Sequence, residues 1–446
     1  MSASIRFRAI AARFSAMFAA FVGSALVALA IVAAPADGQV IAITGGRVFP
    51  VSGPPIDNGT VIIRDGEIAQ VGANIAVPAN AQRVDATGKW VTPGLIDAAT
   101  QLGLFDVGFG GGPTDNAARG RAGDGITPSF SAWEGVNPRS VYIGPARQGG
   151  VTSVITGPSG TGLISGQTAV VDLVDGTVTD MLLKAPAAML AGFDLPVSDK
   201  IGARAELYAR MRELIEDTKS YMRNRASFER NQTRAYSIGR ADLEAMIPVV
   251  EGKMPLAIQA SRASDIEAAI KFAKDNSLKL LIVGGAEAWQ VANALAAAKV
   301  PVLAGAMNNI PTQFNALGQR QENAGLLRAA GVSVAIIGNN GDGDEEQFNI
   351  RNIRQEAGNA IAYGLPWAEG LRATTLSPAE MFGVADRVGS LQPGREANVV
   401  IWSGDPFELS TVAEHVWVRG RESTAPTRQD MLEQRYKTLP PDYKRP

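Results

Sequence analysis

One histidine, His415, is the only imidazole in the 446-residue chain, which also contains no cysteine. Zinc and similar ions bind best to imidazole and thiolate groups, with carboxylates as a supplement. Serine and cysteine nucleophiles usually need a histidine as their base. Because residues 415–419 read as a strand, we predict that His415 is an ordinary strand residue without a catalytic role. The sequence therefore offers little for imidazole-based catalysis of either kind.

Carboxylates and amides supply the remaining polar chemistry, close to the ends of apolar segments. The carboxylates are Asp97, Asp342, Asp344, Glu345 and Glu346, and the amides are Gln101, Gln259, Asn339 and Asn340. Carboxylates bind hard cations, but residues 340–344 lack the glycine and terminal glutamate placement of a calcium loop. We therefore interpret the acidic run as a solvated loop. Amides exchange hydrogen bonds but cannot act as a general base near neutral pH.

Two further residues resemble catalytic groups only superficially. Ser159 lies in a glycine-rich stretch at residues 157–162, which lacks the lysine of a phosphate-binding loop and the spacing of a nucleophile turn. Lys184 has the chemistry of a carboxylated lysine that bridges two metal ions. Its place before Ala185-Pro186 favours a surface turn, and one bridging group cannot hold an ion without other ligands.

Composition is typical of a globular protein with a substantial core. Apolar residues make up 46% of the chain and charged residues 19%. The length suits one large barrel with an accessory domain. The formal net charge of −2 provides no basic surface for nucleic acid. Without cysteine, stability must come from burial and not from disulfides.

The first 36 residues have the pattern of a secretory signal peptide. Arg6, Arg8 and Arg13 form a basic start, residues 14–36 contain no charge, and the stretch ends in an Ala-Pro-Ala cleavage-like site. The uncharged stretch is also long enough to span a bilayer, so an uncleaved membrane anchor is the alternative. Because a strand-like segment follows directly, we expect cleavage and a periplasmic or secreted protein.

Two β-rich segments lie at the ends of the remaining chain, at residues 37–92 and 386–425. Asp65-Gly66, between two stretches rich in β-branched residues, predicts a type I′ hairpin turn. Neither segment can bury a core alone, so we predict that they join into one small β-sandwich. A short helix over residues 427–436, capped by Thr427, is predicted in the tail.

Residues 93–385 alternate apolar strand-like runs with helix-like segments. The predicted strands include residues 151–156, 169–174, 254–259, 278–283, 300–304 and 332–337. Apolar runs separated by helices indicate an α/β fold with a parallel sheet, which we expect to close as a (β/α)8 TIM barrel. Residues 264–267 (Ser-Asp-Ile-Glu) predict a capping box, and residues 204–246 a helical insertion or helix pair. The predicted boundaries are 1–36 for the signal peptide, 37–92 and 386–425 for the sandwich, 93–385 for the barrel and 426–446 for a C-terminal tail.

Residues 93–98 read Pro-Gly-Leu-Ile-Asp-Ala and resemble the first barrel strand of the amidohydrolase superfamily, where a His-x-His pair follows. Residues 44–48, 66–72, 373–383 and 386–400 also resemble segments of that family, particularly of its secreted, imidazolonepropionase-like members. The resemblance implies a TIM barrel with a sandwich and, in intact members, hydrolysis of C–N bonds by a metal-activated water. One departure is Asn398, where the family motif usually has aspartate.

The metal-binding positions that this resemblance implies carry other residues. They are Ala99 and Gln101 at the first strand, Gln259 at the fifth, Gly284 and Gly285 at the sixth, and Asn339 and Asn340 at the eighth. The chain therefore resembles a degenerate member, for which we predict no metal, no other cofactor and no catalytic residue. Barrel sites lie at the carboxyl ends of the strands, so these residues are predicted to line a pocket for a small polar molecule.

Two functions remain open from the sequence, because fold alone does not fix function. The first is a noncatalytic ligand-binding or partner subunit, as a homo-oligomer or in complex with an intact amidohydrolase relative. The second is an enzyme of the resembled family that hydrolyses amide or cyclic amide bonds by a metal-independent route. In both cases metal-dependent catalysis is predicted to be absent and no nucleic-acid partner is expected.

Overall fold

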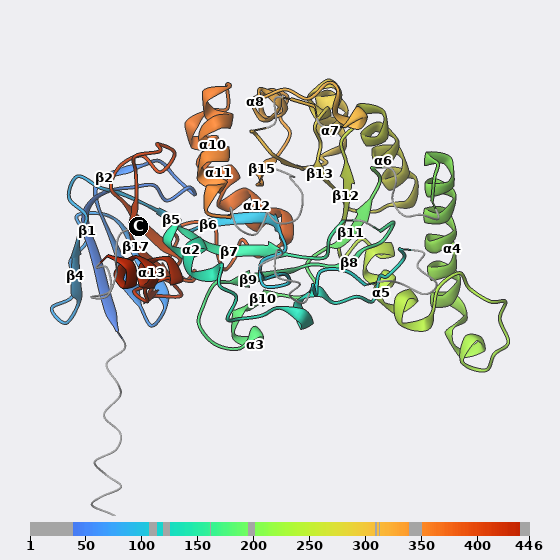
Figure 1. Ribbon diagram of the computed structural model, residues 1–446, viewed down its shortest axis with the longest axis horizontal. Coiled ribbons are helices and arrows are strands. Elements are labelled where there is room, and N and C mark those ends of the chain that lie inside the picture. The colour runs from blue at the N-terminus through green and yellow to red at the C-terminus, as the bar shows by residue number, and fades with distance from the viewer. Residues whose placement is uncertain are drawn as a thin grey trace, which may run out of the picture.

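The computed structural model describes residues 39–106, 114–118, 125–160, 162–194, 201–307, 310–311, 313–338 and 350–437 (Figure 1). The expected signal peptide and the acidic run lie outside these residues, as do two of the predicted pocket residues, Asn339 and Asn340. Among the described helices, none is both long and apolar enough to cross a membrane.

The two ends of the described chain form one eight-stranded sheet, at the left of Figure 1. Its strands are β1 (Val40–Val48), β2 (Ile56–Arg64), β3 (Glu67–Ala73), β4 (Gln82–Asp85), β5 (Trp90–Pro93), β16 (Val399–Trp402), β17 (Ala413–Val418) and β18 (Arg421–Glu422). β5 joins the two ends because it pairs in parallel with β1 and antiparallel with β16. Asp65 and Gly66 connect β2 to β3 with φ angles of 54° and 86°, the positive pair that a type I′ turn needs. The predicted hairpin is therefore confirmed.

One apolar core fills this terminal sheet. Both ends of the chain contribute buried side chains to it, among them Ile43, Ile63, Val399 and Trp417. A short sheet needs such a shared face to be stable. The N-terminal and C-terminal strands are therefore parts of one folded unit.

A second group of strands alternates with helices through the middle of the chain. These strands are β6 (Leu95–Thr100), β7 (Val151–Thr156), β8 (Gly166–Gln167), β9 (Ala169–Asp172), β10 (Leu182–Lys184), β11 (Met189–Gly192), β12 (Leu256–Ala260), β13 (Leu280–Gly284), β14 (Val302–Ala304) and β15 (Val334–Ile336). β11 to β15 pair in parallel in chain order, and β6 pairs in parallel with β7. Parallel ladders whose connections are helices make this an α/β fold, as expected.

The β8–β9 segment does not run as a parallel barrel strand. β8 pairs antiparallel with β11, and β9 pairs antiparallel with β7. The loop 157–165 between β7 and β8 is shorter than the roughly twelve residues that a parallel crossover needs, so the chain returns in the opposite direction. In the described residues no ladder joins β6 to β15, and Ile96 of β6 donates its N–H to Thr374 O at 2.8 Å. The expected parallel direction of residues 169–174 is therefore wrong, and the strands outside the terminal sheet form two mixed sheets.

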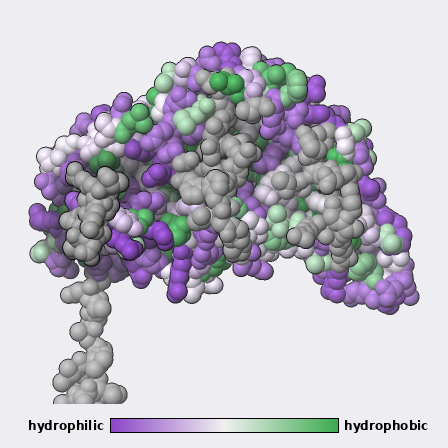
Figure 2. All heavy atoms as spheres, in the orientation of Figure 1, coloured by the Kyte–Doolittle hydropathy of each residue, from purple (hydrophilic) through white to green (hydrophobic). Residues whose placement is uncertain are grey.

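The helices pack along these strands, and two of them extend away from the terminal sheet. They are α2 (Ile143–Gln148), α3 (Val178–Met181), α4 (Arg204–Glu229), α5 (Arg240–Val250), α6 (Ala263–Asn276), α7 (Ala292–Ala298), α8 (Asn323–Ala329), α10 (Ile353–Ala362), α11 (Trp367–Ala373), α12 (Leu376–Phe382) and α13 (Arg428–Tyr436), with 3-10 turns η3 (Ala132–Gly135), η4 (Ala288–Val291), η5 (Phe314–Ala316) and η6 (Ile350–Asn352). α4 and α5 are the predicted helix pair, at the right of Figure 1. Hydrophilic residues dominate the tip at the lower right of Figure 2, where α4 ends.

Helix capping agrees with the sequence at one helix and differs at another. Thr427 caps α13, as predicted, and the structure adds a reciprocal hydrogen bond to Asp430 that completes a capping box. At α6 the predicted capping box is wrong, because the helix begins at Ala263 and no side chain of its own N-cap residue bonds to it. Glu287, from the loop after β13, instead accepts the Ala263 N–H at 3.0 Å. A distant carboxylate thus replaces the local cap.

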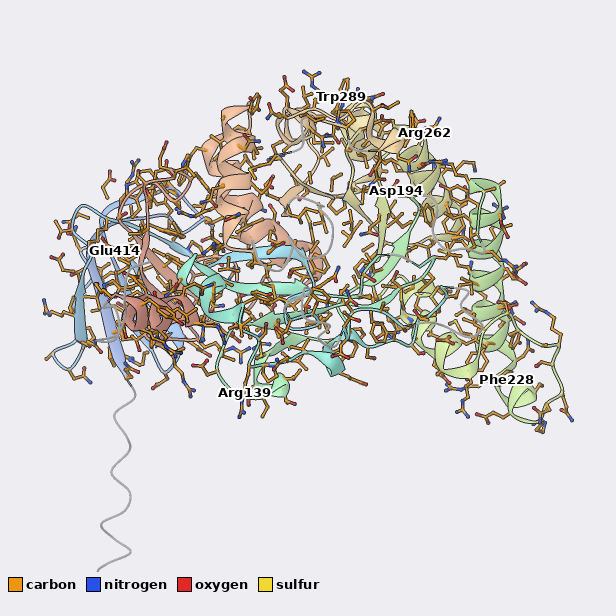
Figure 3. The ribbon with its side chains drawn as sticks, viewed as in Figure 1. Arg139, Asp194, Phe228, Arg262, Trp289 and Glu414 are labelled. Atoms are coloured by element: carbon orange, nitrogen blue, oxygen red, sulfur yellow. The ribbon has the colours of Figure 1, made fainter. Side chains whose placement is uncertain are left out.

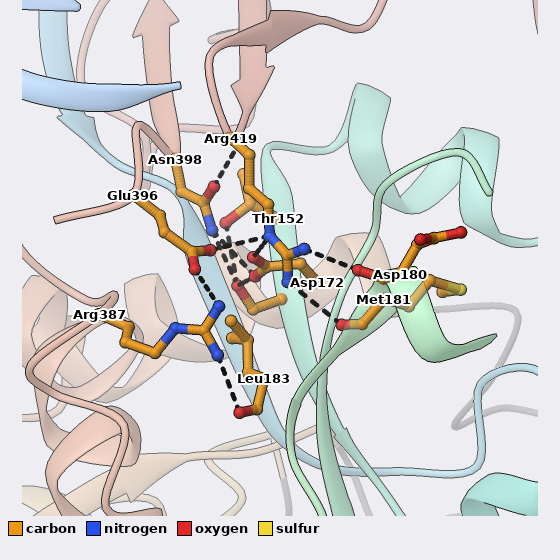
Figure 4. A network of polar contacts seen from close by, with 10 residues as sticks. Thr152, Asp172, Asp180, Met181, Leu183, Arg387, Glu396, Asn398 and Arg419 are labelled. Carbon is orange, nitrogen blue, oxygen red and sulfur yellow. Dashed lines mark hydrogen bonds and ion pairs between the residues drawn. The ribbon is translucent and has the colours of Figure 1, made fainter. Parts of the chain in front are cut away.

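A polar network connects the terminal sheet to the neighbouring strands (Figure 4). Arg419 donates from Nε to Asp172 Oδ2 at 2.8 Å and to Glu396 Oε2 at 2.9 Å, and Arg387 also pairs with Glu396. Asn398 Nδ2 donates to Asp172 Oδ1 at 3.0 Å, while its Oδ1 accepts the Arg419 N–H at 2.8 Å. A carboxylate at position 398 would repel Asp172 and could not donate to it. This explains why the chain carries an amide where aspartate was the expected residue.

The carboxyl group of Asp172 is fully buried in this network, and its protonation is linked to folding. Burial, followed by the hydrogen bond and charge of Glu396, raises the pKa of Asp172 to about 7. Burial would also raise the pKa of Glu396, but its hydrogen bond with Asp172 and the charges of Arg419 and Arg387 lower it. The folded state therefore binds the Asp172 proton more tightly than the unfolded state does. This contribution to stability is fully present below the unfolded pKa of 3.8 and is lost progressively as the pH rises to and through about 7.

We predict that Asp172→Asn removes this pH dependence, because the amide resembles the protonated acid. The wild type should lose about 1 kcal/mol of unfolding free energy between roughly pH 6 and pH 8 relative to the variant. Urea unfolding at these pH values measures the difference. Asp175→Asn is the control, because this exposed carboxylate pairs with Arg147 and lies outside the network. An Asp172→Asn protein that keeps the wild-type slope would contradict the assignment.

Candidate functional site

The predicted site residues that the structure describes lie at the carboxyl ends of three strands. Ala99 lies in β6 and Gln101 follows that strand, Gln259 lies near the end of β12, and Gly284 ends β13. β12 and β13 are neighbours in the sheet. Gly284 and Gly285 have φ angles of 87° and 57°, so the chain turns there without offering a side chain. The structure thus places Gln259 beside the two glycines.

The glycine-rich loop after β7 packs against these strand ends. Gly160 lies so close to Gln259 that a Cβ atom on the glycine would be 1.6 Å from Gln259 Oε1. A Cβ atom at Gly192, the end of β11, would be 2.8 Å from Gly160 O and 2.9 Å from Gly162 O. Only glycine allows the backbone to approach this closely. The loop therefore covers the ends of β11 and β12.

Gln101 is held by a second loop. Its side chain is buried, and Oε1 accepts a hydrogen bond from Asn116 Nδ2 at 2.6 Å. Asn116 O accepts the Ser159 N–H at 2.7 Å, and Gly157 N–H donates to Thr100 O at 3.0 Å. The glycine-rich loop is thus tied to the end of β6 as well. The backbone N–H of Ser159 therefore helps to hold this loop against Asn116.

Asp97 of β6 lies close to the segment that follows β15. Its side chain is 1% exposed, and Oδ1 accepts the Ala99 N–H at 3.1 Å. A Cβ atom at Gly338, just after β15, would lie 3.8 Å from Asp97 Oδ2. The carboxylate is therefore positioned by its own strand end and faces the chain that follows β15.

Asp194 is a strand-end carboxylate that the sequence reasoning missed (Figure 3). It follows β11 and accepts the Ser261 N–H at 3.1 Å and the Ser261 hydroxyl at 2.8 Å. Burial and the nearby charge of Asp265 raise the pKa of Asp194, although these hydrogen bonds oppose the shift. Its position directly after the apolar run 189–193 was the available signal.

Two further carboxylates bind backbone groups near the strand ends. Glu287 accepts the Ala263 N–H at 3.0 Å and the Gly318 N–H at 2.8 Å. Glu356 of α10 is buried and accepts the N–H groups of Ala306 and Met307, both at 2.8 Å. These carboxylates hold the loops after β12, β13 and β14. Their partners are distant in sequence, so no local pattern identifies their role.

The donor groups at the strand ends do not fit a transition-metal ion. The described part of the chain contains no group of three or more histidine, cysteine, aspartate and glutamate side chains that could hold one. His415 lies in β17 of the terminal sheet, as predicted, with Nδ1 2.6 Å from Glu422 Oε1 and its ring stacked on Trp417. Ala99 and the two glycines offer no side-chain donor. Zinc requires imidazole, thiolate or several carboxylates, which the described residues do not bring together here.

Known proteins share both sequence and fold with this chain. Residues 351–423 match the family described as the amidohydrolase family. A crystal structure of an amidohydrolase from Thermotoga maritima MSB8 is 29% identical, with a TM-score of 0.76, and the match covers 86% of this chain and 99% of that one. The chain belongs to the amidohydrolase superfamily.

Other amidohydrolase-superfamily relatives agree over much of the chain. Imidazolonepropionase of Mesorhizobium japonicum is 24% identical over 79% of this chain and 88% of the relative. Amidohydrolase tasK of Hapsidospora irregularis is 22% identical over 81% of this chain, but the match covers only 39% of that longer protein. The structure of molinate hydrolase shares the fold, with 20% identity and a TM-score of 0.53.

We predict that Gly160→Ala displaces the Gln259 side chain and costs about 1 kcal/mol of unfolding free energy by overpacking. Gln259→Ala removes the atoms that the new methyl group meets, so Gly160→Ala should cost much less in that background. Urea unfolding of the four proteins measures this coupling. Gly53→Ala is the control, because a Cβ atom there meets nothing within 4 Å. Strictly additive effects would show that the loop does not lie on Gln259.

Proposed function

We propose that this amidohydrolase-fold protein is noncatalytic and binds a small polar ligand at the carboxyl ends of its strands. The observation that carries the proposal is the set of side chains at these ends. Gln101 and Gln259 offer neutral amides, and Gly284 and Gly285 offer only backbone, where an intact member would have metal ligands. Amides recognise polar groups through hydrogen bonds but do not activate water.

The carboxylates at the same ends support a binding role over a catalytic one. Asp97, Asp194, Glu287 and Glu356 each accept hydrogen bonds from backbone N–H groups. A general base must be able to reach a substrate proton, and these oxygens are directed to loops. The close approach of Asp97 to Gly338 also supports closure of the two strand–helix sheets into one barrel, and the shared core of the terminal sheet supports a sandwich. A closed barrel and a β-sandwich are therefore both part of the proposal.

Export and assembly complete the proposal. The signal-like first 36 residues support a periplasmic or secreted protein, and the lost metal ligands suit a partner subunit of an intact amidohydrolase or a homo-oligomer. N-terminal sequencing and a native mass of the exported protein, alone and with a co-expressed intact relative, test these two parts. A lone monomer that retains its first 36 residues would contradict both.

Metal content and turnover test the noncatalytic role directly. We expect the purified protein to contain no stoichiometric zinc and to leave a panel of dipeptides and cyclic amides intact. Elemental analysis and product detection measure the two quantities, with an imidazolonepropionase as the positive control. Turnover that chelators abolish would overturn the proposal. Turnover that chelators do not affect would overturn it in favour of metal-independent hydrolysis of C–N bonds.

We also predict that Ala99→His with Gln101→His does not restore zinc-dependent turnover. The fifth and sixth strands still end in Gln259, Gly284 and Gly285, so two imidazoles would have too few companions to form a four-ligand site. The double substitution would also remove the hydrogen bond that Gln101 Oε1 accepts from Asn116. Zinc stoichiometry and hydrolysis of the same panel are the measurements. Recovery of activity would show that other groups complete the site.

A further inference from the structure

A cavity lies at the amino ends of the central strands, opposite the ends that carry the candidate site. Its volume is about 810 Å³, and it is lined by Pro255, Leu280 and Pro301, which precede or begin β12, β13 and β14. α6, α7 and α12 also contribute to its walls, and their arrangement around these strands can be followed in Figure 1. Cavities of roughly 300 to 1,000 Å³ are typical of small-molecule sites.

Five lysines line this cavity, although the whole chain has a net charge of −2. They are Lys184, Lys253, Lys274, Lys279 and Lys299. They come from separate segments of the chain, so their convergence is a product of the fold and not a charged face of one helix. Like charges repel across such a cavity unless an anion lies between them.

Few acidic groups offset these lysines. Glu380 also lines the cavity, but its Oε2 is bound by Arg372 at 2.5 Å. Lys253 pairs with Glu251 at 2.8 Å. In the described residues Lys274, Lys279 and Lys299 form no ion pair. At least three ammonium groups are therefore available to an anion.

Lys184 is part of the cavity wall and not a group on a surface turn, which corrects the interpretation made from the sequence. It ends β10, is half-buried, and donates from Nζ to Phe382 O at 2.8 Å. Burial, and then the charge of Lys279, lower the pKa of Lys184, while the charge of Asp386 opposes this shift. Lys279 and Asp386 are therefore both within electrostatic reach of Lys184. The fixed backbone bond holds one positive group in position before any ligand arrives.

The remaining lining is apolar. Ala273, Leu280, Val300 and Phe382 are buried and contribute to the cavity together with Ile270. Inorganic ions gain nothing from such a lining, whereas an organic body gains about 25 cal/mol for each Å² of apolar surface that leaves water. Lysine is a common ligand of phosphate groups.

We propose that this cavity is a second ligand site, which binds a soluble organic phosphate with an apolar body. The phosphate would lie among Lys184, Lys274, Lys279 and Lys299, and the organic body would pack on the apolar wall. The site is independent of the proposed function at the other strand ends, because no residue belongs to both.

Isothermal titration with three matched probes tests the site on the full mature protein. 1-Naphthyl phosphate has both required parts, 1-naphthol lacks the anion and inorganic phosphate lacks the apolar body. We expect 1-naphthyl phosphate to bind at least tenfold more tightly than either fragment, and its affinity to fall as salt rises. Equal affinity for inorganic phosphate, or no binding of 1-naphthyl phosphate, would overturn the proposal.

Charge-removing variants locate the binding. Lys274→Gln with Lys279→Gln should weaken 1-naphthyl phosphate binding at least tenfold, and Lys299→Gln alone should weaken it in the same direction. Lys271→Gln is the matched control, because this lysine is also on α6 but pairs with Asp275 and does not line the cavity. Thermal melting confirms that each variant is folded. Unchanged affinity in the double variant would overturn the proposal.

A lipid headgroup is the other source of the same phosphate chemistry. Sedimentation with phosphatidylglycerol vesicles, compared with phosphatidylcholine vesicles, distinguishes it from a soluble ligand. We expect no sedimentation with either. Binding to phosphatidylglycerol that the lysine variants abolish, without binding of the soluble probe, would overturn the proposal in favour of a membrane surface.

Discussion

The carboxylates at the strand ends accept hydrogen bonds from backbone N–H groups of loops in the same chain. These bonds fix the loops that surround the candidate site. Glu287 and Glu356 each accept two backbone N–H groups of the loops after neighbouring strands, and Asp194 accepts one N–H and one hydroxyl from Ser261. Loops that leave parallel strands have unpaired N–H groups, which must find acceptors when they are buried. A carboxylate that accepts hydrogen bonds from two such groups holds its loops firmly, because charge-assisted hydrogen bonds are stronger than neutral ones. The same bonds occupy these oxygens and oppose their protonation, although burial raises the pKa of Asp194 overall.

Paired polar groups also connect the terminal sheet to the strands beside it. Asp172 and Glu396 meet at Arg419, and an extra carboxylate at position 398 would add a further negative charge beside them. Asn398 instead donates to Asp172 and accepts from the Arg419 backbone. Buried ions are costly unless every partner is present, so the amide and the two guanidinium groups are best understood as one unit. A departure from a family motif can thus be a local adjustment of charge.

Local features could be predicted from the sequence, and features that depend on distant partners could not. The Asp65-Gly66 turn and the Thr427 cap are decided within a few residues, and both are as expected. The superfamily was also recognisable, because its motifs are short and continuous. The direction of β8–β9 depends on neighbours on both sides, and the start of α6 depends on Glu287. The packing of Gly160 on Gln259 requires two segments that are far apart in the sequence to meet, and no periodicity encodes it.

The two ends of the central strands differ in chemistry, and their separation keeps them independent. β12 has five residues, which at about 3.3 Å per residue span roughly 16 Å. Exposed charges are largely screened beyond about 10 Å at ordinary ionic strength. The lysines at the amino ends therefore act only weakly on the neutral amides at the carboxyl ends. The two proposed sites can therefore bind their ligands independently of each other, although the same strands support both.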